Sequence, residues 1–122
     1  MICSSRKLIV SISDEKDSLN LLSIMDSISK IIQFTSNQRD PDAFFTDVKS
    51  FDAVLMNFII IGEMVDRISE EFKKDNPQIE WIRIKGFRNL VAHDYFGIDA
   101  EEVWQIIFND LPILKTEIEK II

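Results

Sequence analysis

The stretch from Asn57 to Val65 reads N-F-I-I-I-G-E-M-V, and it decides the fold of this 122-residue chain. As a helix it would be apolar on nearly every side, so we expect neighbouring elements to bury it from more than one direction. Three adjacent isoleucines would also suit a strand, but the 3.6-residue period of the flanking residues favours a helix. We predict this helix over Asp47 to Lys74, ending before Pro77, because proline disfavours helix at and just before its own position.

An amphipathic pattern precedes this segment and predicts a first long helix from Asp14 to Thr35. The acidic residues of its first turn are interpreted as a solvated helix start near the positive end of the helix dipole, rather than as a metal site. These residues are Asp14, Glu15 and Asp17. Between the two long helices, Asp40 as a cap and Pro41 at the first helical position predict a short helix through Phe45.

Downstream of Pro77, a third major helix is predicted from Trp81 to Val91 or Ala92. Asp99 is a suitable cap for a last helix, which Pro112 restarts because proline is tolerated only in a first turn. We therefore predict an all-α domain over residues 14–122, folded as a four- to five-helix antiparallel bundle. Residues 1–13 are interpreted as an N-terminal extension that could be disordered.

The composition is that of an ordinary globular chain, with 46% hydrophobic and 29% charged residues. The longest purely apolar run, Phe58 to Gly62, is far shorter than the ~20 residues needed to cross a bilayer, so no membrane association is expected. The segment from Met1 to Ser13 has too short an apolar patch for a secretory signal. Cys3 is the only cysteine, which fits a reducing compartment. These features predict a cytoplasmic protein.

The chain is acidic, with 14 Lys and Arg against 21 Asp and Glu and a net charge of −7. Affinity for nucleic acid comes mostly from neutralising phosphates, so indiscriminate binding is not expected. Any nucleic-acid contact should be local, and Arg83, Lys85 and Arg88 lie close enough in sequence to form a cationic patch. This composition argues against a general nucleic-acid coat protein, but it does not exclude a nuclease.

The polar groups suited to chemistry concentrate between Gly86 and Asp99, in G-F-R-N-L-V-A-H-D-Y-F-G-I-D. This stretch holds Arg88, Asn89, Tyr95 and the only histidine, His93. One histidine and one cysteine provide no zinc-binding spacing, and three scattered glycines cannot form a phosphate-binding loop. No metal or cofactor is therefore expected. An arginine fork suits a phosphate and a histidine can move a proton near neutral pH, which is the pair that metal-free RNA cleavage requires.

Structural explanations compete with this one. His93 could serve as a helix cap, and Tyr95 could be a core or interface residue with its hydroxyl at the surface. Glu63 could be a plain surface residue or could orient Arg88. Gly62, which costs ~1 kcal/mol against alanine inside a helix, is best explained by close approach of another helix or of the stretch from Arg88 to Tyr95.

The spacing of the candidate catalytic residues is awkward for a single chain. Five residues along a helix rotate by about 140°, so Arg88 and His93 would not share a face. Either the helix ends before His93, or each residue meets a partner from a second chain. A twofold dimer would bring two histidines and two arginines into one cleft, which suits a reaction needing both a base and an acid.

At these residues the sequence resembles a known family. R-N-L-V-A-H-D-Y is similar to the R-x4-H-x-Y motif of the HepT-like family, toxins within the wider HEPN superfamily. The resemblance continues through D-A-V-L-M-N-F-I-I-I-G-E, N-P-Q-I-E-W-I-R-I-K-G-F-R-N, H-D-Y-F-G-I-D and V-W-Q-I-I-F-N-D-L-P, and it covers roughly residues 18–122. Residues 1–13 have no clear counterpart in the family.

The resemblance implies a bundle of HEPN type and a homodimer with the motif at its cleft. It implies the toxin of a type VII HEPN/MNT toxin–antitoxin system, a metal-independent endoribonuclease acting on RNA such as tRNA or mRNA. Arg88 and His93 carry over as catalytic residues and Asn89 as their polar neighbour. The implied partner is an MntA-type nucleotidyltransferase antitoxin, which silences the toxin by AMPylation of Tyr95. The alternative is a non-catalytic HEPN binding module that partners a nucleotidyltransferase, and the acidic net charge favours that alternative.

Overall fold

The computed structural model describes residues 12–122. The predicted extension, residues 1–13, lies outside this range except for its last two residues, which belong to the first helix. The described chain is helical, without a strand between residues 12 and 122. Its elements, in order, are α2 (Ile12–Thr35), α3 (Pro41–Thr46), α4 (Val48–Arg67), α5 (Glu70–Asp75), α6 (Trp81–His93), the short 3₁₀ helix η1 (Tyr95–Gly97), α7 (Ala100–Gln105), the π-helical turn η2 (Ile106–Asp110) and α8 (Leu111–Ile121).

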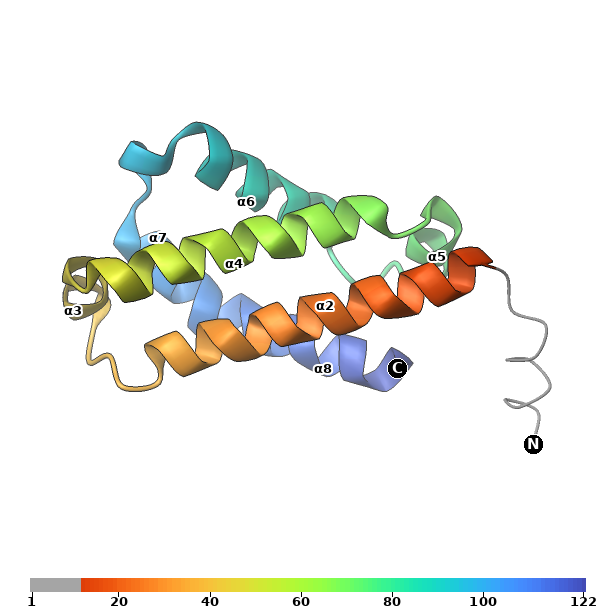
Figure 1. Cartoon of the computed structure of the whole chain (residues 1–122), viewed down its shortest axis with the longest axis horizontal. Helices are drawn as coiled ribbons and strands as arrows, with labels where there is room; N and C mark the ends of the chain where they lie inside the picture. Colours follow the sequence, from red (N-terminus) through yellow and green to blue (C-terminus); the bar gives the residue numbers. More distant parts are fainter. Residues whose placement is uncertain (1–11) are drawn as a thin grey trace.

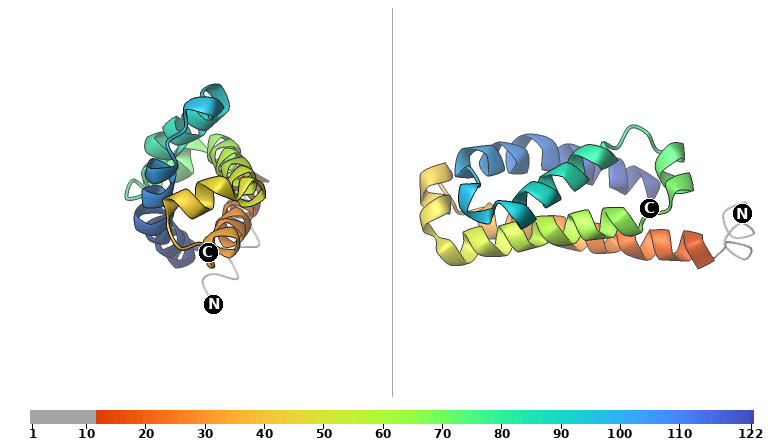
Figure 2. Two further views of the ribbon diagram at one scale, coloured as in Figure 1. Left: turned by 90° about the vertical axis from the view of Figure 1, so that its left-hand side faces the viewer. Right: turned by 90° about the horizontal axis from the view of Figure 1, so that it is seen from above.

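The described helices pack together as a bundle around one apolar core, which confirms the predicted all-α fold. The long helices α2 and α4 lie side by side, and the rod formed by α7, η2 and α8 lies behind them (Figure 1). The short helices α3 and α5 sit at opposite ends of the bundle. Figure 2 shows α6 crossing α4 at an angle, so that its C-terminal end and η1 stand out from the other helices.

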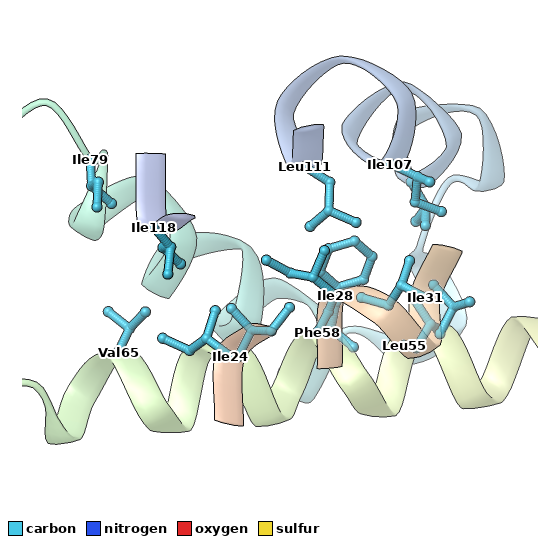
Figure 3. Packing of buried hydrophobic residues seen from close by; sticks show 14 of the residues in the cluster. Ile24, Ile28, Ile31, Leu55, Phe58, Val65, Ile79, Ile107, Leu111 and Ile118 are labelled. Atoms are coloured by element: carbon cyan, nitrogen blue, oxygen red, sulfur yellow. The ribbon is translucent and has the colours of Figure 1, made fainter. Parts of the chain in front are cut away.

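The centre of α4 is buried on more than one side, as its all-round apolar sequence predicts. Leu55, Phe58 and Val65 meet side chains from α2 and from the last rod (Figure 3). Burial of apolar area of this kind supplies most of the stability of a small domain. The core residues contributed by the other elements include Ile24, Ile28 and Ile31 of α2, and Ile107, Leu111 and Ile118 of the last rod.

The predicted single helix from Asp47 to Lys74 is interrupted, so that prediction was wrong in its second half. Ile68 adopts an extended backbone conformation and α5 starts again after Ser69, whose hydroxyl accepts from the Phe72 N–H. Asp17 of α2 fixes this break, because its carboxylate accepts from both the Ser69 N–H, at 2.9 Å, and the Ser69 hydroxyl, at 2.6 Å. Asp17 is only 3% exposed, so it is not part of a solvated helix start.

The local start signals are confirmed. Asp40 caps α3 by accepting from the Ala43 N–H, with Pro41 in its first turn, and Asp99 caps α7. Pro112 lies in the first turn of α8, directly after η2. Because proline has no N–H for a helical bond and clashes with the preceding turn, the wider turn lets the rod continue instead of ending.

Candidate functional site

Helix α6 carries three of the candidate residues, Arg88, Asn89 and His93, and His93 is its last residue. The helix therefore does not end before His93, which excludes one of the two explanations for the awkward spacing. On a continuous helix the two residues are separated by about 140° of rotation and ~7.5 Å of rise. A single chain thus presents Arg88 toward α4 and His93 in another direction.

A close approach between α4 and α6 occurs at Gly62. A Cβ atom built at Gly62 would overlap Cβ and Cγ of Arg88 and would lie 3.4 Å from its Cδ. The arginine stem therefore lies directly against the backbone of α4, in space that only glycine leaves open. This contact confirms the prediction that Gly62 permits the approach of the segment carrying Arg88.

Two carboxylates of α4 hold the Arg88 guanidinium. One terminal nitrogen, Nη1, donates to Glu63 Oε1, and the other, Nη2, donates to Asp66 Oδ2 at 2.8 Å. Glu63 therefore orients Arg88, which decides between the two explanations for it. The Arg88 side chain is 13% exposed, and its buried Nε has no hydrogen-bond partner within the described residues.

Asp66 also accepts from Lys85 Nζ, at 3.2 Å. Burial alone would raise the pKa of Asp66, but the hydrogen bonds and positive charges of Lys85 and Arg88 outweigh it and hold that pKa below its ordinary value. The carboxylate consequently stays ionised and keeps Arg88 in a fixed position near neutral pH.

Tyr95, on η1, reaches back to α4. Its hydroxyl donates to Asp52 Oδ1, across 43 residues of sequence. The hydrogen bond to Asp52, with a smaller effect of desolvation and of the carboxylate charge, raises the pKa of Tyr95 above its ordinary value. The residue is 41% exposed, so its phenol is tethered but accessible.

The outward side of α6 is open to solvent. Asn89 and His93 are exposed, and Ile82, on the same side, is 89% exposed. These three residues recur at helical spacing along one stripe. Beyond the helix end, Phe96 is 98% exposed and packs edge-on against the Tyr95 ring. This surface therefore leaves both apolar side chains and the candidate residues Asn89 and His93 uncovered.

The predicted cationic patch is divided. Arg83 pairs with Asp110 of η2 at 2.9 Å, whereas Lys85 and Arg88 face Asp66 on α4. All three cations are therefore paired with carboxylates, and they point toward two different elements. The prediction of one continuous patch was wrong because helical rotation separates residue 83 from residues 85 and 88.

An apolar groove of about 100 Å³ lies between α6 and the η2–α8 part of the last rod. Its lining includes Phe58, Ile84, Phe87 and Leu111. Arg88, His93 and Tyr95 are not among the lining residues, so this groove is separate from the polar motif.

Neither a metal site nor a membrane helix is evident in the described part of the chain. Between residues 12 and 122, the side chains of His, Cys, Asp and Glu do not gather in a group of three that could hold a metal ion. None of the helices in this range combines the length and apolar character that crossing a bilayer requires.

Sequence reasoning missed Asp52 and Asp66 as parts of this site. Glu63 and Asp66 lie 11 and 14 residues after Asp52 along α4, and these spacings bring all three residues close to the same side of the helix. This acidic stripe, Asp52, Glu63 and Asp66, is visible in the sequence as a pattern. Only the packing of α6 and η1 onto α4 shows that the stripe faces the motif.

Comparison with known proteins identifies the family of this chain. The family model described as Ribonuclease HepT-like matches residues 24–121, and the chain belongs to this family. "Putative RNase MJ0127" of Methanocaldococcus jannaschii is 37% identical over 102 residues, covering 84% of each chain. "Probable ribonuclease HepT" of Thermococcus cleftensis is 35% identical over 98 residues, covering 80% of this chain and 88% of the relative. No solved structure matches the chain significantly.

Proposed function

We propose that this protein is a metal-independent endoribonuclease, the toxin of a type VII HEPN/MNT toxin–antitoxin pair. The observation that carries the proposal is that α6 bears both Arg88 and His93, in a chain of the Ribonuclease HepT-like family. Arg88 is held rigidly by α4, while His93 is open to solvent at the end of the helix.

The proposed chemistry divides between these two side chains. His93 takes the proton from an RNA 2′-hydroxyl, and the 2′-oxygen attacks the adjacent phosphorus. The bond to the 5′-oxygen of the next nucleotide then breaks, leaving a cyclic phosphate. Arg88 stabilises the charge that develops on the phosphorus oxygens. A guanidinium has five N–H donors, so the bonds to Glu63 and Asp66 leave donors that can meet a phosphate.

We propose that the working unit is a homodimer. The 5′-oxygen leaving group needs a proton, and one chain supplies a single histidine. The open side of α6 supports a second copy there, because apolar residues at both of its ends are almost fully exposed, Ile82 in the first turn of α6 and Phe96 on η1 beyond His93. Two such stripes related by a twofold axis would place one His93 as base and the other as acid.

Tyr95 is the proposed point of control. A nucleotidyltransferase antitoxin of the MntA type would transfer AMP from ATP to its hydroxyl. The added phosphate would lie two residues from His93 and would repel an RNA phosphate. The partial exposure of Tyr95 on the protruding η1 turn supports access by such a partner.

RNA cleavage by purified protein tests the proposal. Total RNA and purified tRNA are incubated in EDTA with wild type, Arg88→Ala, His93→Ala and, as a matched cation control, Arg39→Ala in the α2–α3 loop. We expect cleavage by wild type and Arg39→Ala, and a loss of about 10²–10⁴-fold for His93→Ala. Cleavage that survives both motif substitutions would reject the assigned site.

The alternative function is a binding module that partners a nucleotidyltransferase without cleaving RNA. The net charge of −7 and the pairing of Arg83, Lys85 and Arg88 with carboxylates favour it. Mass spectrometry of the protein co-expressed with an MntA-type nucleotidyltransferase distinguishes the two. An added AMP on Tyr95 supports the toxin, and a stable unmodified complex supports the binding module.

A further inference from the structure

The three carboxylates of the acidic stripe on α4 are not equivalent. Glu63 and Asp66 each face the Arg88 guanidinium, and Asp66 also faces Lys85. Asp52 instead faces the neutral phenol of Tyr95 and has no ion pair within the described residues. A carboxylate paired with a cation is a weakened base, whereas one that accepts a phenolic hydrogen bond is placed to take that proton.

A purely structural role does not explain this contact well. Asp52 and Tyr95 are both exposed, and a hydrogen bond between exposed groups adds little to folding stability. The contact instead places a carboxylate at the only tyrosine of the chain, on the oxygen that a modifying enzyme would need as a nucleophile. A phenol near neutral pH is protonated and is a poor nucleophile until a base accepts its proton.

We propose that Asp52 is the general base for nucleotidyl transfer to Tyr95, an inference that rests on the proposed control of the toxin by AMPylation. The Tyr95 oxygen attacks the α-phosphorus of ATP, and the phenolic proton passes to Asp52 Oδ1. The bond between the α-phosphorus and the oxygen bridging to the β-phosphate breaks, and pyrophosphate leaves. The product is a phosphodiester between Tyr95 and AMP, and Asp52 returns the proton to water. The protein to be modified therefore supplies the base for its own modification.

This arrangement also predicts selectivity. A nucleotidyltransferase without a residue of its own to deprotonate the tyrosine could still modify Tyr95, because Asp52 of this chain accepts the proton. It would not modify an exposed tyrosine placed elsewhere on this chain without a neighbouring carboxylate.

The test measures transfer of AMP from radiolabelled ATP by an MntA-type nucleotidyltransferase. The substrates are wild type, Asp52→Asn, Asp52→Glu and Asp75→Asn, the last being a matched exposed aspartate on α5. We expect Asp52→Asn to lower the rate by about 10²–10⁴-fold without changing the KM for ATP. Its remaining rate should rise with pH as tyrosinate forms, Asp52→Glu should restore part of the rate, and Asp75→Asn should match wild type.

The outcomes separate this inference from the proposed function. Wild-type rates with Asp52→Asn would overturn the inference and would place the base in the nucleotidyltransferase, while AMPylation itself would stand. Absence of transfer to wild type would overturn the proposed control and the inference with it. A loss that Asp52→Glu does not restore, with an unchanged pH profile, would show that Asp52 only positions Tyr95. Circular dichroism of each variant confirms that the bundle is folded.

Discussion

Replacing Gly62 by alanine should destabilise the protein, although alanine is the better helix former. Inside a helix, alanine is favoured over glycine by about 1 kcal/mol. At Gly62, however, the new methyl group would overlap Cβ and Cγ of Arg88. These atoms form the stem of the side chain and cannot swing away, so α6 itself would have to move, by on the order of 1 Å, to restore a carbon–carbon contact of ~3.5 Å.

The change in the free energy of unfolding is the cost of overpacking and of weakened Arg88 pairing, less the gain in helix propensity. Overpacking of this kind typically costs about 1–3 kcal/mol, and moving α6 also weakens the pairing of Arg88 with Glu63 and Asp66. Subtracting the helix-propensity gain of about 1 kcal/mol leaves about 0–2 kcal/mol, and the weakened pairing of Arg88 adds about 0.5 kcal/mol. We therefore expect Gly62→Ala to lower the free energy of unfolding by about 1–2 kcal/mol. For a domain of this size, Tm should fall by roughly 4–8 °C. RNA cleavage should fall as well, because Arg88 is displaced.

Gly86→Ala is the matched control. Gly86 also lies inside a helix, but a Cβ there meets nothing within 4 Å. The same substitution should therefore raise the free energy of unfolding by about 0.5–1 kcal/mol. Urea unfolding followed by circular dichroism at several protein concentrations checks both values, since only an effect on a dimer depends on concentration. Equal stabilisation by the two variants would refute the close approach of α4 and α6.

Substitutions at Asp17, His93 and Asp52 test three other features of the fold and the site. Asp17→Ala should lower the free energy of unfolding in urea by about 1–3 kcal/mol, because it removes a buried carboxylate and leaves the half-buried Ser69 N–H without its partner. An unchanged value would show that this contact does not fix the helix break. His93→Ala should lower RNA cleavage by about 10²–10⁴-fold while changing the free energy of unfolding by no more than about 0.5 kcal/mol, since the side chain is exposed. A large drop in Tm would indicate a structural role. Tyr95, the only tyrosine, should titrate above the ordinary pKa of ~10 in absorbance at 295 nm, and Asp52→Asn should lower that midpoint. The pKa of Tyr95 is higher in the folded than in the unfolded chain, so the stability that this contact adds is fully present below pH ~10 and is lost as the pH rises through the folded pKa. Identical titration curves for wild type and Asp52→Asn would contradict the contact.

Much of the fold could be predicted from local signals. The apolar period of α2 and α4, the caps at Asp40 and Asp99 and the position of Pro112 all act on residues within about one helical turn. Such signals act between residues that are close in sequence, so they can be recognised without knowledge of the tertiary structure. The motif residues Arg88, His93 and Tyr95 are also identifiable in this way, by their chemistry and spacing.

What each motif residue faces was decided by tertiary structure. The break at Ile68 depends on Asp17, which is 52 residues away from Ser69 in sequence. The orientation of Arg88 depends on two carboxylates more than 20 residues upstream. Helical periodicity indicates which side of a helix is apolar, but it does not indicate which polar residue on that side meets another helix. That choice depends on how the rods pack, and therefore on the whole chain.

By itself, the sequence determined that this protein is an α-helical bundle with an arginine, a histidine and a tyrosine on one polar stretch. Only the tertiary structure decided that Arg88 pairs with carboxylates of α4 and that His93 faces solvent. It also decided that Asp52 accepts the hydrogen bond from the Tyr95 hydroxyl. The physical reason is that residue chemistry and helical period are local properties. Partnership between side chains, in contrast, requires the close approach of α4 and α6 that Gly62 permits.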